Sequence, residues 1–348
     1  MGTPAYVPVY ALSRGNVTES IHYGAAALVS ATGELIAAVG DPYQSAYLRS
    51  TAKPFQALPF VMAGGEAHYM LEPKELALIC SSHSGTDEQV RVLVGLQNKA
   101  GVSEQQLLCG IHPPFHEPTA KELEKRGLTS ASNHHDCSGK HTGMLAYAKM
   151  RRWPLENYID LNHPLQQEII DLFAELAGAS RSELQLGIDG CSAPNWCAPL
   201  FNTALAYARL MDPSGLPDAL ADACALVRDA MLAHPDMVAG PERFDTDLMY
   251  TTGRILAKSG AEGFQALGLP PGIIGPGSPA IGITLKIADG DARGWARPAV
   301  ALEILRRLGA VTENELGILN HYGPVRPISN WRGLVVGEAG PGFDLQRQ

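Results

Sequence analysis

The chain has 348 residues, of which 45% are hydrophobic and 18% charged, and its formal net charge is −9. This composition predicts a compact folded protein with a large core and excludes a disordered chain. The net negative charge argues against nucleic acids and anionic membranes as partners, because both require a basic surface.

Nothing at the start of the chain marks it for secretion. Residues 1–8 have neither the basic segment nor the apolar segment of a signal peptide. No run approaches the roughly 18 apolar residues that span a membrane. We therefore expect a cytoplasmic protein without a membrane partner, whose six cysteines are reduced.

The first 40 residues predict β-strands. Residues 6–14, 23–29 and 34–39 have the composition of strands, and the turn at Ser30–Gly33 joins the last two as a hairpin.

Residues 50–235 alternate helical segments with loops rich in glycine and proline. Apolar residues recur at helical spacing in seven segments of this part. The segments are 72–81, 87–100, 118–126, 143–151, 164–177, 202–211 and 216–234.

The last hundred residues return to strands. A helix is predicted at 250–258, strands at 280–287 and 334–338, and an amphipathic helix at 296–308. Strands at both ends of a helical block predict an α+β fold, with one antiparallel sheet built from N- and C-terminal segments.

We expect a single catalytic unit over residues 1–348 with two lobes. Residues 1–49 plus 250–348 would form the lobe that contains the sheet, and residues 50–249 the mainly helical lobe.

A hydroxyl and an amine lie three residues apart in Ser50-Thr51-Ala52-Lys53, at the predicted start of a helix. One helical turn places such residues on the same face. A lysine whose pKa falls below its usual value of about 10.4 can take the proton of a serine. Ser-x-x-Lys is the acylation dyad of the penicillin-recognising serine enzymes, although a solvated helix turn has the same pattern.

Two further segments carry hydroxyl groups. Residues Cys80–Gly85 follow an apolar helix, and their composition favours a helix cap and turn. Lys258-Ser259-Gly260 resembles the Lys-Thr-Gly element of penicillin-recognising sites, in which the lysine supplies fixed positive charge. The end of a helix is the alternative interpretation. The intervening Ser-Asp-Asn element is absent, which argues against a true β-lactamase.

Two glycine-containing loops, at residues 134–141 and 187–194, hold cysteine, histidine and aspartate. These side chains are soft or borderline ligands that suit Zn²⁺. Buried thiols and ordinary loop histidines are an equally good interpretation. The ligands that spacing alone predicts are Cys137 and Cys191 with one or two of His134, His135 and His141.

Together these segments resemble the bacterial asparaginase II family of the Rhizobium etli inducible type. The resemblance covers nearly the whole chain. It is carried by Glu19–His22, Arg49–Pro54, Ser82–Gly85, His135–His141, Gly190–Pro194, the Lys258 segment and Gly282–Gly290.

The resemblance implies hydrolysis of L-asparagine to L-aspartate and ammonia, on a fold similar to serine β-lactamases and glutaminases. It implies a homodimer, and two Ser-Lys dyads that carry over as Ser50 with Lys53 and Ser82 with Lys258. Lys53, neutral or sharing a proton, would take the proton of Ser50, and Lys258 with Ser82 would shuttle protons.

The resemblance also implies a zinc site, with a lysine in place of the histidines that spacing predicts. Its ligands would be Cys137, Lys140 and Cys191, and the metal would have a supporting role rather than generate the nucleophile. Arg49, His141 and Asp189 match residues that line the substrate or support the metal.

Three alternatives remain at this point. A glutaminase or another amidase would keep both dyads and change only the substrate. A zinc hydrolase would lose activity on chelation and keep it without Ser50. A binding or regulatory protein is disfavoured because both serines and both lysines are present.

Overall fold

The computed structural model describes residues 5–347, which divide into two compact units. One, here called the sheet unit, comprises residues 5–51, 198–212 and 251–347. The other, the helical unit, comprises residues 52–197 and 213–250. Unlike the lobes expected from the sequence, the sheet unit includes a segment from the middle of the chain.

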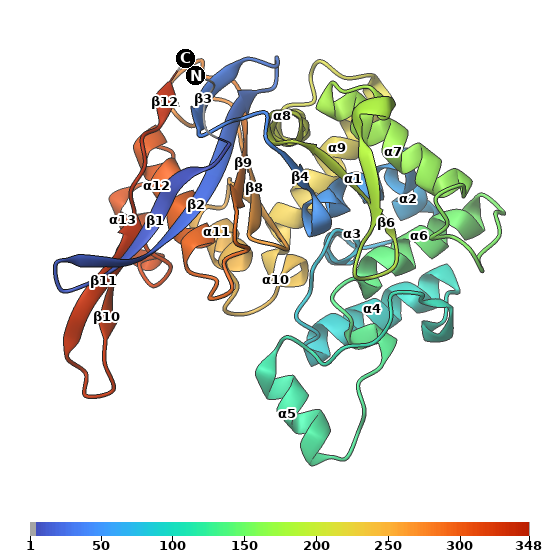
Figure 1. Ribbon diagram of the computed structural model, residues 1–348. Helices are drawn as coiled ribbons and strands as arrows, with labels where there is room; N and C mark the ends of the chain where they lie inside the picture. Colours follow the sequence, from blue (N-terminus) through green and yellow to red (C-terminus); the bar gives the residue numbers. More distant parts are fainter. Residues whose placement is uncertain (1–4, 348) are drawn as a thin grey trace. The chain divides into compact units, whose positions relative to one another are not determined.

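The sheet unit is built on one antiparallel sheet whose strands come from both ends of the chain (Figure 1). The strand order is β10-β11-β1-β2-β9-β8-β7, and β3 pairs with both β2 and β12. The strands are β1 (Val7–Arg14), β2 (Val17–Ser30), β3 (Leu35–Val39), β7 (Leu256–Gly260), β8 (Phe264–Leu269), β9 (Ile281–Ile287), β10 (Arg326–Ser329), β11 (Val335–Pro341) and β12 (Gln346–Arg347); β4 (Ser45–Tyr47) also lies in this unit. The predicted α+β class and the hairpin of β2 with β3 are confirmed.

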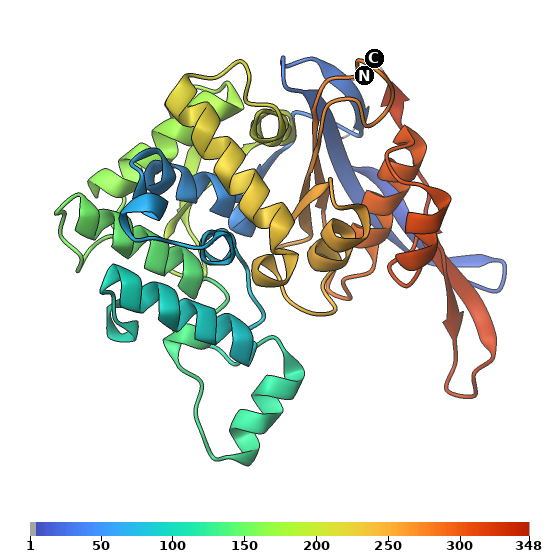
Figure 2. The ribbon, with the colours of Figure 1, turned by 180° about the vertical axis from the view of Figure 1, so that it is seen from behind.

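Helices cover both faces of this sheet. Helix α8 (Leu200–Met211) packs on β2, β8 and β9, and α12 (Ala296–Leu308) packs against β1, β9 and β11. Gly282 and Thr284 of β9 face α8: a Cβ on Gly282 would lie 1.8 Å from the Ala204 carbonyl oxygen, and Thr284 donates to the Leu200 carbonyl. Figure 2 shows α12, in orange-red, against the opposite face, beside α13 (Glu313–Ile318).

The helical unit packs its helices around α1 (Lys53–Met62), nine residues of which are buried. Helix α1 contacts α6, α7 and α9. The other helices of the unit are α2 (Gly65–His68), α3 (Pro73–Ile79), α4 (Asp87–Ala100), α5 (Glu117–Lys125), α6 (Ser138–Met150), α7 (Pro164–Ala177), α9 (Asp218–Ala233) and α10 (Pro235–Val238); α11 (Phe244–Thr252) ends past its boundary, and β5 (Gln185–Ile188) pairs with β6 (Pro194–Pro199).

Two of the predicted elements are wrong in ways that affect the site. Helix α6 begins at Ser138 rather than 143, because Gly139 and Gly143 let it approach α3 closely; a Cβ on Gly139 would lie 2.1 Å from the Leu78 carbonyl oxygen. The helix predicted at 250–258 ends at Thr252, and Lys258 lies on strand β7. Short apolar runs do not distinguish helix from strand by periodicity.

Candidate active site

Ser50 lies in a short 3₁₀ helix, Arg49–Ala52, that leads directly into α1 at Lys53. Arg49 has φ of 50°, a left-handed conformation that is uncommon for a non-glycine residue and is often found at functional sites. Within the sheet unit, Thr51 Oγ1 donates to the Leu48 carbonyl at 2.7 Å and Tyr207 Oη donates to the Thr51 carbonyl at 2.8 Å. These bonds fix the backbone that carries Ser50.

Lys258 lies on β7, in the same unit as Ser50. Its side chain is fully buried, and Nζ donates to the Ser259 carbonyl at 2.9 Å. At the end of the strand, a Cβ on Gly260 would lie 2.8 Å from the Leu48 carbonyl oxygen and 3.3 Å from the Thr51 nitrogen. The strand of Lys258 therefore packs against the segment that carries Ser50, and a small residue at position 260 permits this approach.

Lys53, the first residue of α1, is buried among oxygen atoms of the helical unit. Its Nζ donates to Ser82 Oγ at 2.9 Å, to the Asp136 carbonyl at 3.3 Å and to Asp136 Oδ2 at 3.4 Å. Burial disfavours the charged form, but the negative charge of Asp136 and the Cys137 and Cys191 sulfur atoms together outweigh it and raise the pKa of Lys53. The sequence predicts a neutral or proton-sharing Lys53, whereas the raised pKa favours its charged form.

Ser82 follows α3 in the turn that the sequence predicted for residues 80–85. Its backbone N–H donates to the Val238 carbonyl at 2.8 Å. The Gly85 N–H donates to Nδ1 of His83, so Nε2 carries the proton and donates to Ser138 Oγ at 2.7 Å. Burial lowers the pKa of His83 to about 3, so the ring is neutral. Its hydrogen bond to Ser138 holds the turn against α6.

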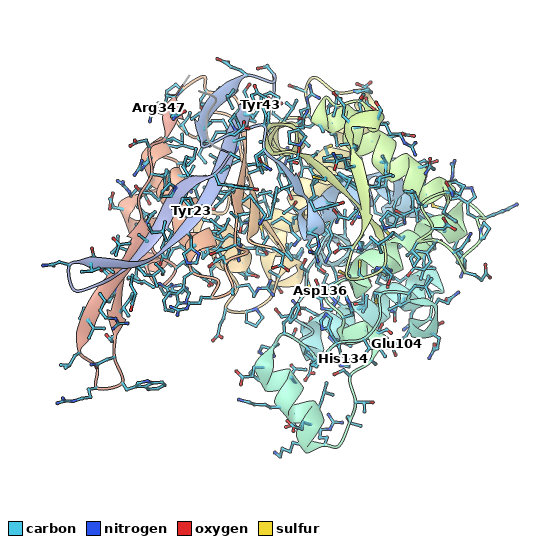
Figure 3. All side chains as sticks on the ribbon, in the orientation of Figure 1. Tyr23, Tyr43, Glu104, His134, Asp136 and Arg347 are labelled. Atoms are coloured by element: carbon cyan, nitrogen blue, oxygen red, sulfur yellow. The ribbon has the colours of Figure 1, made fainter. Side chains whose placement is uncertain are left out.

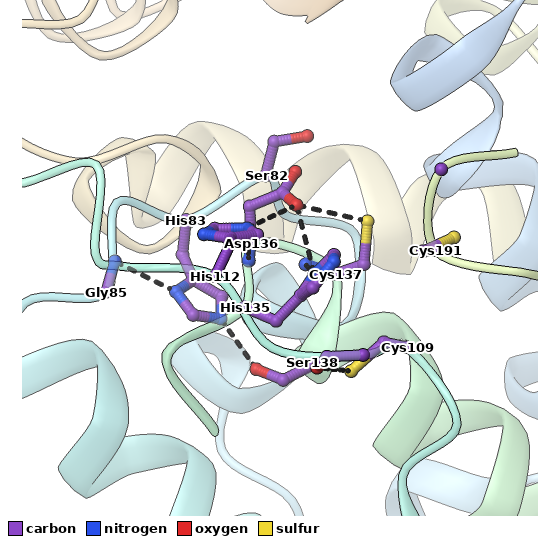
Figure 4. Close-up of polar contacts among 12 residues, drawn as sticks. Ser82, His83, Gly85, Cys109, His112, His135, Asp136, Cys137, Ser138 and Cys191 are labelled. Carbon is purple, nitrogen blue, oxygen red and sulfur yellow. Dashed lines mark hydrogen bonds and ion pairs between the residues drawn. The ribbon is translucent and has the colours of Figure 1, made fainter. Parts of the chain in front are cut away.

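Asp136 was missed as a site residue by the sequence analysis. One carboxylate oxygen, Oδ1, faces both imidazoles, 3.3 Å from His112 Nε2 and 3.2 Å from His135 Nδ1 (Figure 4). Burial opposes ionisation, but the Lys53 ammonium holds the pKa of Asp136 well below its usual range. Figure 3 labels Asp136 in the helical unit, and the only signal for it in the sequence is its place before Cys137.

The two ring nitrogens that face Asp136 already accept hydrogen bonds. The Asp136 N–H donates to His112 Nε2 at 3.1 Å, and the Cys137 N–H donates to His135 Nδ1 at 3.0 Å. Each imidazole nitrogen has a single lone pair, so neither is free to bind a metal ion. The cluster of His112, His135 and Asp136 is therefore a hydrogen-bonded scaffold, although its ligand atoms lie within 4.8 Å of one another.

The structure brings Cys137, Lys140 and Cys191 together, as the family resemblance implied. Cys137 occupies the N-cap position of α6 and Lys140 lies in its first turn, whereas Cys191 lies in a tight turn after β5. Lys140 Nζ lies 2.8 Å from Cys191 Sγ, and a hydrogen bond between the two thiols lowers the pKa of Cys137. Burial disfavours the charged form of Lys140, but the neighbouring sulfur atoms outweigh it and raise its pKa.

His141 lies beside these sulfur atoms, and its hydrogen bonds define its tautomer. The Tyr158 hydroxyl accepts the Leu108 N–H at 2.9 Å, so its own proton goes to His141 Nδ1 at 2.6 Å. Nε2 then carries the ring proton; no partner within residues 5–347 lies at ordinary hydrogen-bond geometry, but the Cys191 sulfur acts on the ring as a weak hydrogen-bond acceptor and through its charge. His141 thus presents an N–H rather than a lone pair, which makes it unsuitable as a ligand, and burial lowers its pKa to about 4.

The donor set of this sulfur cluster fits zinc. Two thiols and one amine converge in a buried site, and thiolates and nitrogen bases are the ligands that Zn²⁺ prefers. The amine has to lose its proton when the metal binds, as a thiol does. The prediction of histidine ligands from spacing is not supported by the geometry, because His135 and His141 are engaged otherwise.

The residues predicted to line the substrate lie in different units. Arg49 belongs to the sheet unit, whereas His141 and Asp189 belong to the helical unit. Asp189 Oδ1 accepts the Gly190 N–H at 2.8 Å and Oδ2 accepts from the Asn195 amide at 3.2 Å. Its charge acts on Lys140, which places it beside the sulfur cluster.

The family L-asparaginase II matches residues 10–341, which is nearly the whole chain. The chain therefore belongs to the L-asparaginase II family, and it is an amidohydrolase. A search of curated proteins found no match. None of the helices in residues 5–347 combines the length and apolar composition needed to cross a membrane.

Solved structures of Bacillus glutaminases are similar to this chain at low identity. A probable glutaminase from Bacillus subtilis has a TM-score of 0.41 and 14% identity, over 82% of this chain and 88% of that one. A Bacillus glutaminase in 4.3 M NaCl has a TM-score of 0.40, 14% identity and coverages of 82% and 90%. The probable Bacillus subtilis glutaminase bound to 6-diazo-5-oxo-L-norleucine has a TM-score of 0.41, 14% identity and coverages of 82% and 83%. At these scores the likeness carries no argument, and the assignment depends on the family match.

Proposed function

We propose that this protein hydrolyses L-asparagine to L-aspartate and ammonia through a serine acyl-enzyme. Membership of the L-asparaginase II family supports the reaction. The observation that carries the serine chemistry is the fully buried Lys53, whose Nζ lies 2.9 Å from Ser82 Oγ. A buried amine bonded to a hydroxyl provides the proton transfer that activates a serine.

In this proposal Ser50 is the nucleophile and Lys53 exchanges its proton. Because nearby negative charge raises its pKa, Lys53 starts as an ammonium in this proposal. It gives a proton to Ser82 Oγ while Ser82 gives its own hydroxyl proton to the neutral amine of Lys258, and the free amine of Lys53 then accepts the proton of Ser50. Ser50 Oγ attacks the side-chain amide carbon, the tetrahedral intermediate collapses, and the relay protonates the departing ammonia. Water then attacks the β-aspartyl ester, which releases aspartate and returns the proton to Ser50.

Zinc has a supporting role in this proposal. Cys137, Lys140 and Cys191 would hold it, and the bound ion would supply fixed positive charge near the substrate. Without any step at the metal, these residues tie the start of α6 to the turn after β5. Arg49, His141 and Asp189 are proposed to bind substrate or support the metal, and the homodimer and cytoplasmic location stay predictions.

The test is ammonia release from L-asparagine and L-glutamine by the wild type, Ser50→Ala and the exposed control Ser182→Ala, each with and without added zinc. Asparagine turnover that is lost in Ser50→Ala and kept in Ser182→Ala would support the proposal. Turnover of glutamine alone would keep the mechanism and change the substrate. Normal turnover by Ser50→Ala would exclude Ser50 as the nucleophile.

A further inference from the structure

We propose that Asp136 is a positioning residue that holds Nζ of Lys53 against Ser82 Oγ. The inference rests on the proposed serine amidohydrolase function and adds a residue to it. It depends on the arrangement of three side chains in the helical unit, Lys53, Ser82 and Asp136.

Asp136 supplies two of the three hydrogen-bond acceptors of Lys53. An ammonium group has three N–H bonds in fixed tetrahedral directions. At Lys53 these bonds are directed to the Asp136 carbonyl, to Asp136 Oδ2 and to Ser82 Oγ, at 3.3, 3.4 and 2.9 Å. Two acceptors from one residue therefore determine where the third N–H points, and that is at the hydroxyl.

Asp136 is itself held in place on both sides. The His112 ring accepts a hydrogen bond from the backbone N–H of Asp136, and the His135 ring accepts one from the backbone N–H of Cys137. The ring centroids of the two histidines are 4.2 Å apart, and His112 Nδ1 donates to the Pro113 carbonyl at 2.7 Å. Because the acceptors of Lys53 are fixed before substrate arrives, the amine does not have to reorient during the reaction.

The same contacts could belong to a pair that only stabilises the fold. A buried lysine needs a negative partner in either case, so loss of stability in a variant does not distinguish the two roles. A positioning role predicts a fall in kcat at constant KM, and recovery when a free carboxylate is supplied. A structural role predicts neither.

The variants for the test are Asp136→Asn, which keeps the shape and removes the charge, and Asp136→Ala, which leaves space for a small anion. Asp171→Asn is the control, since Asp171 is an exposed partner of Arg181 in the same unit. Thermal unfolding and bound zinc are measured for each variant, because Asp136 precedes Cys137. The readouts are kcat and KM for L-asparagine and L-glutamine, and the rate at which a fluorophosphonate phosphonylates the serine with loss of fluoride, followed by intact mass.

We expect Asp136→Asn to lower kcat and the fluorophosphonate rate on the order of 10²-fold, with little change in KM. Millimolar formate should restore part of the activity of Asp136→Ala and leave Asp171→Asn unchanged. Wild-type rates in Asp136→Asn would overturn the inference. So would rates that fall only together with stability or zinc and show no recovery with formate.

Failure of the proposed function gives a different pattern. A wild type that is inactive on both amides would contradict the proposed substrate. The fluorophosphonate reaction needs no amide substrate, so its dependence on Asp136 still decides the inference. A wild type that does not react with the probe would overturn it.

Discussion

Two fully buried lysines of the helical unit, Lys53 and Lys140, differ in the atoms that accept their hydrogen bonds. Lys53 Nζ donates to a hydroxyl, a carbonyl and a carboxylate, whereas Lys140 Nζ donates to the sulfur of Cys191 at 2.8 Å. In both cases nearby negative charge outweighs burial and raises the pKa of the amine. Burial and the direction of the pKa shift are thus shared, and only the partner atoms differ: oxygen atoms suit Lys53 to the proposed proton relay, and sulfur atoms suit Lys140 to the proposed metal site.

The largest expected effect is at Lys53. Lys53→Met removes the amine that exchanges protons with the serines, so we expect ammonia release to fall by about 10²- to 10⁴-fold. Bound zinc should be unchanged, because the sulfur cluster keeps its ligands. The matched control is Lys99→Met, which removes an amine that pairs with Glu75 at 2.7 Å in the same unit. Turnover within a few-fold of the wild type in Lys53→Met would contradict the proton relay.

The next effect is at the sulfur cluster. Cys191→Ala removes one of the three proposed ligands, and we expect zinc affinity to fall by at least about 10²-fold, since even outer partners of metal ligands are worth 10- to 100-fold. Competition with a chromogenic chelator measures the affinity. Cys224→Ala is the control, because this buried thiol lies in α9 and burial raises its pKa to about 12. Equal zinc affinity in the two variants would show that the cluster does not hold the metal.

A smaller effect concerns His83, the neutral histidine next to Ser82. The pKa of His83 is about 3 in the folded state, against about 6.5 when unfolded, so the unfolded state binds the proton more tightly. Stability is therefore complete above pH 6.5 and falls as the pH decreases toward 3. From pH 7 to pH 5 His83 alone costs about 2 kcal/mol in the free energy of unfolding.

Denaturant titrations of the wild type and His83→Gln at these two pH values test this prediction. The variant should be less stable at pH 7, because it loses a fixed hydrogen-bond pair, but it should lose less stability between pH 7 and pH 5. An equal pH dependence in the two proteins would show that His83 is not the group that takes up the proton.

The smallest expected effect is at Tyr158. Tyr158→Phe removes the hydroxyl that sets the tautomer of His141, and we expect about 1 kcal/mol lower stability and roughly tenfold weaker zinc binding. The serine relay shares no hydrogen bond with Tyr158, so kcat at saturating zinc should stay near the wild-type value. A large fall in kcat would show that the two lysine sites are not separate.

The sequence was sufficient for the elements that carry regular patterns. The helices predicted at 87–100, 164–177 and 296–308 are confirmed without change, and so is the antiparallel sheet from both ends of the chain. Each of these has a continuous apolar period that a single chain displays.

Features that depend on distant partners were not predictable in this way. The start of α6 at Ser138 depends on the close approach of α3. Glycines permit such an approach, but their presence in a sequence does not predict it. The raised pKa of Lys53 depends in part on Asp136, 83 residues away. Likewise, the place of Lys140 rather than a histidine beside Cys191 came from a family resemblance, because spacing does not show that His141 is already bonded to Tyr158.

The most direct test of the account is to trap the covalent intermediate. The wild type is mixed with L-asparagine, quenched in acid within milliseconds, digested and analysed by mass spectrometry. We predict a β-aspartyl ester on the peptide that contains Ser50, and none in Ser50→Ala. An ester on Ser82, or turnover without any ester, would contradict the proposed role of Ser50.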